Sequence, residues 1–536
     1  MWGATHVVFK RLKNFSPSKI DFKEAHVDVP PIGRWSRPDG HHTEISIYNV
    51  LTKNNEPLIL QNKGVVKWYS CGPTVYDSAH IGHACCYMRF DIIRRILENF
   101  FNLKVCYVMG ITDIDDKIIV RSNILKEDPA KLTKRYEKEF FSDLVKLNIL
   151  PPTTLARVTN HIPEIVDFVN KIIQSSLAYS TPDGSVYFDT QLYGKYGKFY
   201  ATPDESLSEA NTPYKKHPLD FALWKGAKPD EPFWDSPWGK GRPGWHIECS
   251  AMASKYFGSQ VDIHSGGIDL FFPHHEDEEA QCCAYHGISQ WVNYWIHSGH
   301  LFLKNMVKMS KSLQNTVTVD QFLEKHTAND FRFLCLLSRY RKNVQYDSDI
   351  LVTAVALQKK FGTFLDSADT YIDNFRDQGV LDPKLMQTLQ ETDDKVRSAL
   401  ANDFNTSLAL SHLTDLVSST NILMAPGANG NPIAVTLVAS FVRRTLSLLG
   451  VDYKPVQDLL DSAPNIEEMM SASVDFRSEI RNQVIDLLRQ KENLEPKDQL
   501  KALLEICDKF RDTLSDAGVV IKDLKDKSVW SFNTKK

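Results

Sequence analysis

A strand–helix–strand pattern in the first quarter of the chain constrains the fold more than any other feature. Residues 65–71 form a short apolar run suited to a buried strand, and Gly72-Pro73 ends it. From about Gly82, apolar residues recur three, four or one positions apart through Phe101, as the buried face of a helix requires. Residues 104–111 form a second apolar run. This order predicts a parallel sheet with a right-handed crossover.

The loops after these two strands are where we expect a functional site. Parallel sheets of this kind bind ligands beyond the carboxyl ends of their strands. Residues 71–83 and 112–117 follow the two predicted strands and emerge at that edge.

The composition excludes several classes of protein. The 536 residues correspond to about three to four domains. With 42% hydrophobic and 24% charged residues, the chain is not disordered, collagen-like or a coiled coil. A formal net charge of −4 argues against a polycation that coats nucleic acid, although local basic grooves remain compatible with it. No uncharged apolar run approaches the about 18 residues of a membrane helix, so we expect no membrane partner.

Cysteine and histidine are unevenly used. Nine cysteines without regular spacing indicate a reducing compartment, with thiols that are free or bound to metal. Eight of the 17 histidines fall between His217 and His300.

The pattern changes several times along the chain. Residues from about 127 to 235 are mixed, polar and rich in proline, which indicates an insertion into the sheet domain. The sheet resumes near Trp245, with a further strand at 261–264, and helical periodicity dominates beyond about residue 320. Residues 462–465 resemble a linker, and a helix followed by a strand-like stretch at 519–524 ends the chain.

The first 20 residues are basic, poor in acidic residues and amphipathic. This is the pattern of an organelle transit peptide. A disordered basic tail is the alternative, since arginine and serine are scarce. Composition alone supports the transit peptide and the disordered tail equally.

The loop at 71–83 contains His80-Ile-Gly-His83 at a strand-to-helix junction. The two imidazoles lie on one side of the first helical turn, where their N–H groups and the helix N-terminus can hold phosphate. Gly82 lets a base or ribose approach the backbone closely. A capped helix with exposed histidines is the simpler interpretation of this segment alone.

A second segment, Lys308-Met-Ser-Lys311-Ser312, has two lysines in a short polar loop. Such a loop suits a mobile clamp on a triphosphate or leaving pyrophosphate. Alone it is more often a solvated basic turn. The two segments together, in this order, resemble the signature pair of class I aminoacyl-tRNA synthetases.

A third set has the chemistry of a zinc site: Cys71, Cys249, His274 and Glu278. A histidine and a glutamate four residues apart share one helix face, and two thiolates complete a plausible donor set. Spacing leaves the register open, because His275 and Glu279 are also four apart. A charged surface helix beside buried cysteines fits the spacing equally.

Five segments together resemble the cysteinyl-tRNA synthetase family: Cys-Gly-Pro-Thr-Val-Tyr-Asp at 71–77, Thr-Asp-Ile-Asp-Asp-Lys at 112–117, Gly-Trp-His-Ile-Glu-Cys at 244–249, Phe-Pro-His-His-Glu-Asp-Glu at 272–278 and Lys-Met-Ser-Lys-Ser at 308–312. Matching runs extend from about residue 47 to 530.

The resemblance implies a role for each motif residue. One zinc ion per chain is expected on Cys71, Cys249, His274 and Glu278. Substrate cysteine is expected among Gly72, Thr112, Trp245 and His264. ATP, with magnesium, is expected at His80, Gly82 and His83, and Lys308 and Lys311 are expected to act with the two histidines in catalysis.

The implied activity is ATP-dependent conversion of L-cysteine to cysteinyl-adenylate, followed by transfer to tRNA-Cys. A soft zinc ion can accept a substrate thiolate, whereas the hydroxyl of serine coordinates weakly, so we expect no editing site. A monomer is expected. A secondary activity attributed to the family, pyridoxal-phosphate-linked cysteine persulfide synthesis, is a further expectation, weakened by Val120, which stands where many relatives have lysine.

The implied fold is α/β: a Rossmann-like parallel-sheet catalytic domain with an insertion, a helical domain and a small C-terminal anticodon-binding domain. The expected boundaries are 1–44 for an extension with a transit peptide, 45–126 and 236–320 for the two halves of the catalytic domain, 127–235 for the connective insertion, 321–461 for the stem-contact and helical domain, and 465–536 for the anticodon-binding domain. The matching core starts near residue 47, so the surplus leader predicts a mitochondrial matrix protein.

Three further residues depart from the family pattern without removing a proposed ligand: Gly110, Ser265 and Gln314. Ligases that join cysteine to a sugar amine share the catalytic fold but lack the tail at 465–536, so the tail favours tRNA. A methionyl-type enzyme is disfavoured because no CxxC zinc knuckle is present. A non-enzymatic RNA-binding relative is the remaining alternative, against which the two intact signatures argue.

Overall fold

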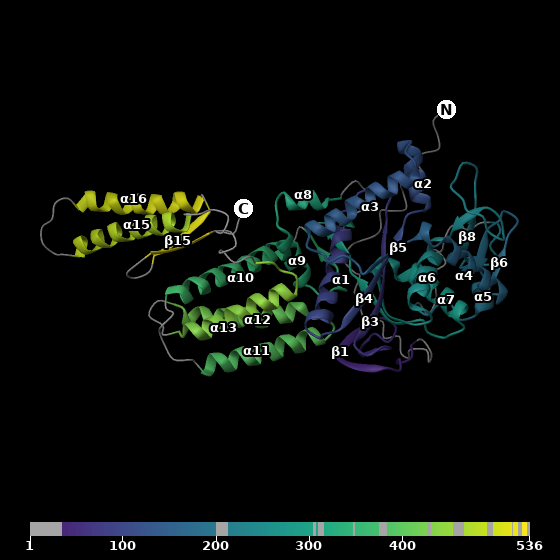
Figure 1. Cartoon of the computed structure of the whole chain (residues 1–536), viewed down its shortest axis with the longest axis horizontal. Helices are drawn as coiled ribbons and strands as arrows, with labels where there is room; N and C mark the ends of the chain where they lie inside the picture. Colours follow the sequence, from purple (N-terminus) through teal and green to yellow (C-terminus); the bar gives the residue numbers. More distant parts are fainter. Residues whose placement is uncertain are drawn as a thin grey trace, which may run out of the picture.

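A five-stranded parallel sheet forms the centre of the computed structural model (Figure 1). The strand order is β11-β10-β3-β4-β5. Their bounds are Val65–Thr74 for β3, Lys104–Thr112 for β4, Thr154–Arg157 for β5, Val261–Gly267 for β10 and Val292–Ser298 for β11. All neighbouring strands pair in parallel. The predicted parallel sheet is therefore confirmed.

The structure describes residues 35–199, 213–303, 307–308, 316–346, 349–374, 383–425, 430–453, 466–489, 497–516, 518–523 and 528–532. The predicted transit peptide and the linker at 462–465 lie outside these ranges.

The strand order places a topological switch point between β3 and β10. From β3 the chain moves outward through β4 to β5, and it later returns to the other side of β3 with β10 and then β11. Connections that diverge in this way open a crevice at the carboxyl ends of the two central strands. The loops after β3 and β10 therefore face one crevice.

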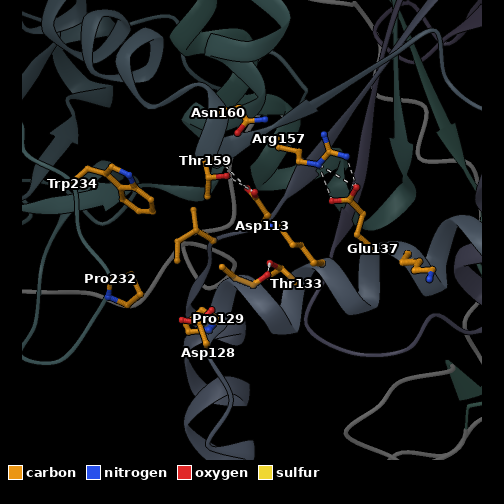
Figure 2. A pocket seen from close by; sticks show the side chains of 14 residues that line it. Asp113, Asp128, Pro129, Thr133, Glu137, Arg157, Thr159, Asn160, Pro232 and Trp234 are labelled. Atoms are coloured by element: carbon orange, nitrogen blue, oxygen red, sulfur yellow. Dashed lines mark hydrogen bonds and ion pairs between the residues drawn. The ribbon is translucent and has the colours of Figure 1, made fainter.

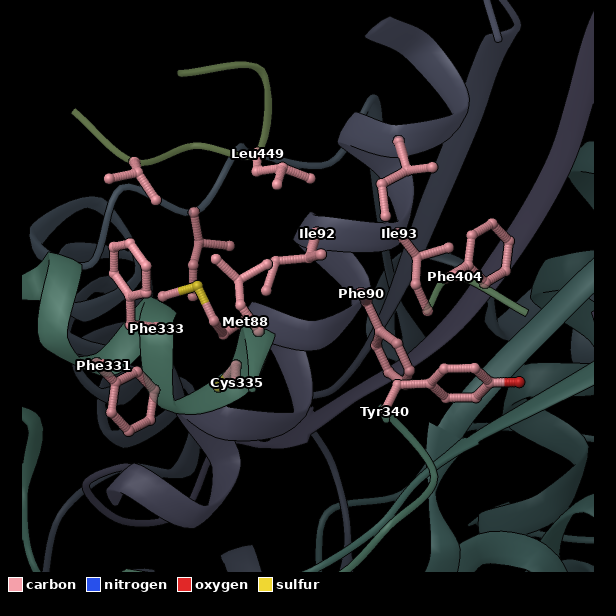
Figure 3. Packing of buried hydrophobic residues seen from close by; sticks show 14 of the residues in the cluster. Met88, Phe90, Ile92, Ile93, Phe331, Phe333, Cys335, Tyr340, Phe404 and Leu449 are labelled. Atoms are coloured by element: carbon pink, nitrogen blue, oxygen red, sulfur yellow. The ribbon is translucent and has the colours of Figure 1, made fainter. Parts of the chain in front are cut away.

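Helices cover both faces of the sheet. The crossover helix α1 (Ile81–Asn99) packs on one face with α9 (Ala328–Leu336), where Met88 lies beside Phe331, Phe333 and Cys335 and Phe90 lies beside Tyr340 (Figure 3). The opposite face is covered by α4 (Ile162–Gln174), α6 (Trp245–Phe257) and α7 (Glu276–His286). Burial of both faces explains why the strands are short, nearly continuous apolar runs.

The segment expected to be an insertion contributes to two sheets. It begins with α3 (Pro129–Lys146), and β5 and the short helix η1 (Val158–Asn160) follow. β5 pairs with β4, so the central sheet takes its outer strand from this segment. A separate antiparallel sheet, β6-β7-β8-β9, follows with bounds Ala178–Ser180, Val186–Phe188, Phe221–Gly226 and Gly241–Pro243. A four-residue helix, α5 (Thr190–Tyr193), lies between its strands in the sequence.

Smaller elements flank the central sheet. The hairpin β1 (His41–Asn49) and β2 (Asn54–Leu60) precedes β3. β12 (Leu301–Leu303) pairs with β13 (Val307–Lys308) and β14 (Val344–Gln345). Two short helices, α2 (Asp116–Leu125) and α8 (Val319–Leu323), complete this part, along with η3 (Ile268–Leu270) and η4 (Phe271–His275) before α7.

The C-terminal part is mostly helical, as predicted. Four long helices follow α9: α10 (Asp349–Asn374), α11 (Pro383–Ala401), α12 (Thr406–Leu423) and α13 (Pro432–Leu448). The last unit consists of α15 (Ile466–Arg489), α16 (Lys497–Asp516) and the antiparallel pair β15 (Val519–Asp523) and β16 (Ser528–Phe532). Figure 1 shows this unit beside the free end of α10. Within the described ranges, no helix is long and apolar enough to cross a membrane.

Candidate metal and substrate site

Four potential metal ligands from separate parts of the chain meet in the crevice. Cys71 lies in β3, Cys249 in α6, His274 in η4 and Glu278 in the first turn of α7. All four side chains are buried. Their ligand atoms lie within 4.8 Å of one another.

The separations within this set match a tetrahedral zinc site. The Cys71 sulfur lies 3.8 Å from the Cys249 sulfur, 3.5 Å from His274 Nε2 and 3.6 Å from Glu278 Oε1. Zn–S bonds of about 2.3 Å and Zn–N or Zn–O bonds of about 2.0–2.2 Å imply ligand separations of about 3.5 to 3.8 Å in a tetrahedron. His274 Nε2 and Glu278 Oε1, 2.8 Å apart, are closer than that and form a hydrogen bond. The donors thus fit zinc in type, and the three separations from the Cys71 sulfur fit it in spacing.

Of the alternative pair that spacing left open, Glu279 is bonded elsewhere, whereas His275 Nε2 lies 3.6 Å from the Cys71 sulfur. Glu279 is 2.5 Å from the Lys198 ammonium, and it accepts hydrogen bonds from the backbone N–H groups of Trp291 and Val292. His275 Nδ1 lies 2.7 Å from His297 Nε2. A second donor set of Cys71, His264, His275 and Glu278 also converges, but it contains one thiol instead of two. The set with two thiols is the better match for a soft cation.

Charge in the site favours a cation. Burial raises the pKa of Glu278, but His264 and His274 outweigh it and hold that pKa at about 2. The thiol of Cys71 stabilises the Cys249 thiolate and lowers the pKa of Cys249 to about 6, whereas burial raises the pKa of Cys71. Burial disfavours the imidazolium of His274, but Glu278 outweighs it and raises the pKa of His274 to about 10. A cation that displaced this proton would meet a thiolate and a carboxylate.

Neighbouring side chains orient the two ligands from η4 and α7. His246 Nδ1 lies 2.7 Å from His274 Nδ1, and His246 Nε2 lies 3.3 Å from Asp277. His264 Nε2 lies 2.7 Å from Glu278 Oε2, which leaves Oε1 directed toward the Cys71 sulfur. Such outer contacts fix the ring tautomer and carboxylate orientation of metal ligands.

The four residues expected around substrate cysteine surround the same cluster. Gly72 follows Cys71, and a Cβ there would lie 1.9 Å from the Gly110 carbonyl oxygen. Thr112 donates to Glu248 Oε2 at 3.0 Å, and Trp245 stacks on His274 with ring centroids 4.5 Å apart. His264 stacks on Trp295 at 4.6 Å. The structure therefore brings all four together.

Tyr69, which the motifs did not single out, lies beside Gly110 and the metal ligands. The Tyr69 hydroxyl is fully buried, and Cys249, Cys71 and Glu278 face it. A Cβ at Gly110 would lie 2.3 Å from this hydroxyl oxygen. The departure at Gly110 therefore makes room for Tyr69. In the register of β3 and β4, Gly110 pairs with Cys71, which is two residues beyond Tyr69 and on the same face of the sheet.

The departure at Ser265 is accommodated away from the metal ligands. Its hydroxyl accepts a hydrogen bond from Trp68 Nε1 at 2.8 Å and donates one to Ser70 Oγ at 3.0 Å. The backbone at Gly266 runs close to His275, since a Cβ there would lie 3.0 Å from that ring. Gln314 lies outside the described residues.

The first signature forms the start of α1. His80 is the N-cap, and its Nδ1 accepts a hydrogen bond from the Gly82 N–H at 3.1 Å. His83 Nδ1 accepts from the His80 N–H at 3.3 Å, and the two rings stack with centroids 3.8 Å apart. A Cβ at residue 82 would lie 2.8 Å from the His80 ring, so this arrangement requires glycine. Both imidazoles thus lie at the positive end of the helix.

The second signature is described only at its edges. Lys308 ends the short strand β13, and its side chain and Lys311 lie outside the described residues. Downstream, the Val317 carbonyl accepts a hydrogen bond at 2.9 Å from the N–H of Ile81, the residue between His80 and Gly82. The segment that follows the lysines therefore reaches the start of α1.

Comparisons with known proteins agree with this architecture. Residues 58–356 match the family described as tRNA synthetases class I (C) catalytic domain, and residues 395–454 match the DALR domain. The chain is 42% identical over 563 residues to a protein of Xenopus tropicalis named probable cysteine–tRNA ligase, mitochondrial, with 100% of this chain and 98% of that protein covered. The chain belongs to the cysteine–tRNA ligase family. The predicted family is therefore confirmed.

Other members and a more distant fold relative support the same placement. The cytoplasmic cysteine–tRNA ligase of Dictyostelium discoideum is 40% identical over 545 residues, which cover 94% of this chain and 80% of that protein. A structure of Mycobacterium tuberculosis methionyl-tRNA synthetase bound by methionyl-adenylate has a TM-score of 0.55 at 14% identity. It covers 72% of this chain and 92% of that one, and it shows the shared class I fold.

Proposed function

We propose that the protein activates L-cysteine with ATP and transfers it to tRNA-Cys. The observation that carries the proposal is the four-donor set of Cys71, Cys249, His274 and Glu278 in the same crevice as a helix that begins with His80 and His83. Membership in the cysteine–tRNA ligase family supports this reaction.

Zinc is the metal that this donor set would hold, one ion per chain. When bound, it supplies a soft coordination position for a thiol, and this favours cysteine over serine. The chain's own residues position the remainder of the amino acid. Trp245 and His264 form walls beside the metal ligands, and Thr112 is held by Glu248 at the carboxyl end of β4.

The start of α1 would bind ATP. His80 and His83 lie at the helix N-terminus, where N–H groups and the helix dipole favour phosphate. In the proposed reaction the cysteine carboxylate attacks the α-phosphate, which forms cysteinyl-adenylate and releases pyrophosphate with its magnesium. Lys308 and Lys311 are proposed to neutralise the charge that develops on the leaving group.

The 3′-terminal ribose of tRNA would then accept the cysteinyl group, with release of AMP. The unit at 466–532 is proposed to contact the anticodon, where unpaired bases are recognised by stacking and by their hydrogen-bonding edges. This unit also disfavours a ligase that acts on a small amine. Persulfide synthesis is not part of the proposal, since Val120 is 58% exposed on α2 and offers no amine.

Mitochondrial translation is the proposed setting. Relatives named as mitochondrial enzymes match 100% and 92% of this chain at 42% and 36% identity. We propose import into the matrix, with the leader removed before about residue 45. A fusion of residues 1–45 to a fluorescent protein should colocalise with mitochondria, and a diffuse cytosolic signal would contradict this.

Exchange of pyrophosphate into ATP tests the activation step. We expect cysteine-dependent exchange in the zinc-loaded protein and its loss in Cys249→Ala. The matched control is Cys106→Ala, because Cys106 lies on β4 but outside the donor set. Exchange that persists in Cys249→Ala, or that serine supports equally, would overturn the zinc proposal.

A further inference from the structure

A second pocket lies beside the candidate site, between α3, η1 and the loop before β9. Its volume is about 560 Å³, within the range of pockets that bind small ligands. Figure 2 shows Trp234 on one side, Asp113 and Thr159 opposite, and Thr133 of α3 below them. The motifs and the proposed reaction assign no role to this pocket.

Three of the charged groups that line the pocket, Arg157, Glu137 and Asp113, are bonded within the protein. Arg157 and Glu137 form a two-pronged ion pair, with Arg157 Nε 2.9 Å and Nη2 2.5 Å from the carboxylate oxygens. Asp113 accepts hydrogen bonds from the backbone N–H and the hydroxyl of Thr159. Asp128 also lines the pocket, so three carboxylates stand against three cations and the formal charge of the lining sums to zero.

Lys134 and Lys138 are the two cations in the lining without a carboxylate bonded to them in the described ranges. They lie four residues apart on α3, so both face the pocket from the same side of the helix. Both are exposed, and neither forms an ion pair with any residue in the described ranges. The pocket therefore offers two free cations at its rim.

Trp234 provides a flat apolar wall. The indole is half-buried, and no described aromatic ring stacks on it. Its backbone is fixed, because its N–H donates to the Gly241 carbonyl at 2.7 Å and its carbonyl accepts from the Gly241 N–H at 3.0 Å. A fixed aromatic face beside two cations is the arrangement that binds an unpaired nucleotide.

The pocket adjoins the place where acyl transfer is proposed. Asp113, in its wall, directly follows Thr112, which is hydrogen-bonded to Glu248 next to Cys249. The insertion is attached at the same edge, since both Lys225 of β8 and Arg242 of β9 form ion pairs with Asp116. A single-stranded nucleic acid whose end lay at the candidate site would pass this pocket.

We propose that the pocket holds an unpaired nucleotide of the tRNA 3′ end, with its base on Trp234 and its phosphate between Lys134 and Lys138. The exposed amide of Asn160 lies at the rim, where it can hydrogen-bond the edge of the base. This proposal rests on the proposed function and specifies how the acceptor end is held.

Binding of tRNA to the full-length, zinc-loaded protein tests the stacking wall. Trp234→Ala should raise the Kd for tRNA-Cys about 5- to 150-fold, the range for loss of one stacked base, and Trp234→Phe should restore most of the affinity. Phe233→Ala is the matched control, because this neighbouring aromatic residue is 46% exposed and does not line the pocket. A Kd for Trp234→Ala within twofold of wild type would overturn the proposal.

A shortened tRNA tests which nucleotide occupies the pocket. Removal of the three 3′-terminal nucleotides should weaken binding to the wild type more than binding to Trp234→Ala, since only the wild type loses the contact with the indole. Equal weakening of both tRNAs by Trp234→Ala would show that another part of the tRNA binds there, which contradicts the assignment.

The lysines give a readout that does not depend on Trp234. The double variant Lys134→Ala/Lys138→Ala should bind tRNA with a weaker salt dependence. The slope of the logarithm of the association constant against the logarithm of the salt concentration should become less steep by about 0.7 to 1.4, as expected for the loss of one or two contacts with single-stranded phosphates. Lys131→Ala, on α3 but outside the pocket, should leave the slope unchanged. An unchanged slope in the double variant would count against the phosphate assignment. Wild-type protein that charges no tRNA would instead refute the proposed function itself.

Discussion

His264 and Glu278 form a buried contact in which the imidazole Nε2 lies 2.7 Å from one oxygen of the carboxylate. The second oxygen of Glu278 lies 3.6 Å from the Cys71 sulfur. His264 thus holds one oxygen of the Glu278 carboxylate and leaves the other oxygen to serve as a metal ligand. This contact connects β10 to the first turn of α7, and it fixes the orientation of the Glu278 carboxylate within the donor set.

Replacement of His264 should therefore weaken zinc binding without removing a ligand. We expect His264→Ala to lower zinc affinity about 10- to 100-fold, the usual effect of losing an orienting partner. Competition with a chromophoric chelator measures this directly. His286→Ala is the matched control, because His286 lies at the opposite end of α7 and bonds Ser254. Equal zinc affinity in His264→Ala and wild type would contradict the role of this contact.

Enlarging Gly110 should disturb its contact with Tyr69. A Cβ at this position would lie 2.3 Å from the Tyr69 hydroxyl oxygen, so Gly110→Asn overpacks a fully buried contact. We expect a loss of about 1–3 kcal/mol in stability, seen as a lower Tm, and slower cysteine-dependent pyrophosphate exchange. Tyr69→Phe combined with Gly110→Asn should recover part of both, since the oxygen that clashes is gone. A Gly110→Asn protein with wild-type Tm would show that this contact repacks freely.

The buried ion pair between α1 and α9 should be costly to break. Arg332 lies 2.5 Å from Asp91 and also donates to the carbonyl of Asn148, and both charged side chains are almost fully buried. Asp91→Ala leaves the guanidinium buried without its anion, for which about 3–5 kcal/mol is typical. The exposed pair Arg397–Glu44 provides the comparison, and Glu44→Ala should cost less than about 1 kcal/mol. Thermal unfolding should rank the Tm values of the three proteins, with wild type highest, Glu44→Ala slightly lower and Asp91→Ala lowest.

The C-terminal unit should lose stability in acid through Asp523. The Arg477 guanidinium lowers the pKa of Asp523 from its usual value of 3.8 to about 2. A carboxyl group with a depressed pKa in the folded state stabilises that state above its unfolded pKa, and this stabilisation disappears as the pH falls through about 2. Hydrogen exchange in residues 519–532 should show Asp523→Asn less protected than wild type at pH 5. The difference should narrow from about pH 4 toward pH 2, and a constant difference would contradict this assignment.

The sequence predicted the sheet better than it predicted the site. The apolar runs at β3 and β4 and the periodic face of α1 were sufficient for the parallel sheet, because each is a local pattern. The addition of β5 to the same sheet was not visible, since four residues among polar neighbours carry no comparable pattern.

The donor set shows a different limit of prediction from the sequence. Cys71 and Cys249 are 178 positions apart, so spacing could not show that their sulfurs meet. The choice between His274 with Glu278 and His275 with Glu279 depends on which glutamate bonds the backbone at Trp291, a contact between distant segments. Tyr69 and Trp234 were missed for the same reason, since only the tertiary structure places them at a pocket or beside ligands.

Aminoacylation of purified tRNA-Cys is the most direct test of the central claim. The zinc-loaded protein should attach labelled cysteine to tRNA-Cys in the presence of ATP, and it should attach no serine under the same conditions. Protein that activates cysteine but charges no tRNA-Cys, or that charges serine as well as cysteine, would contradict the account.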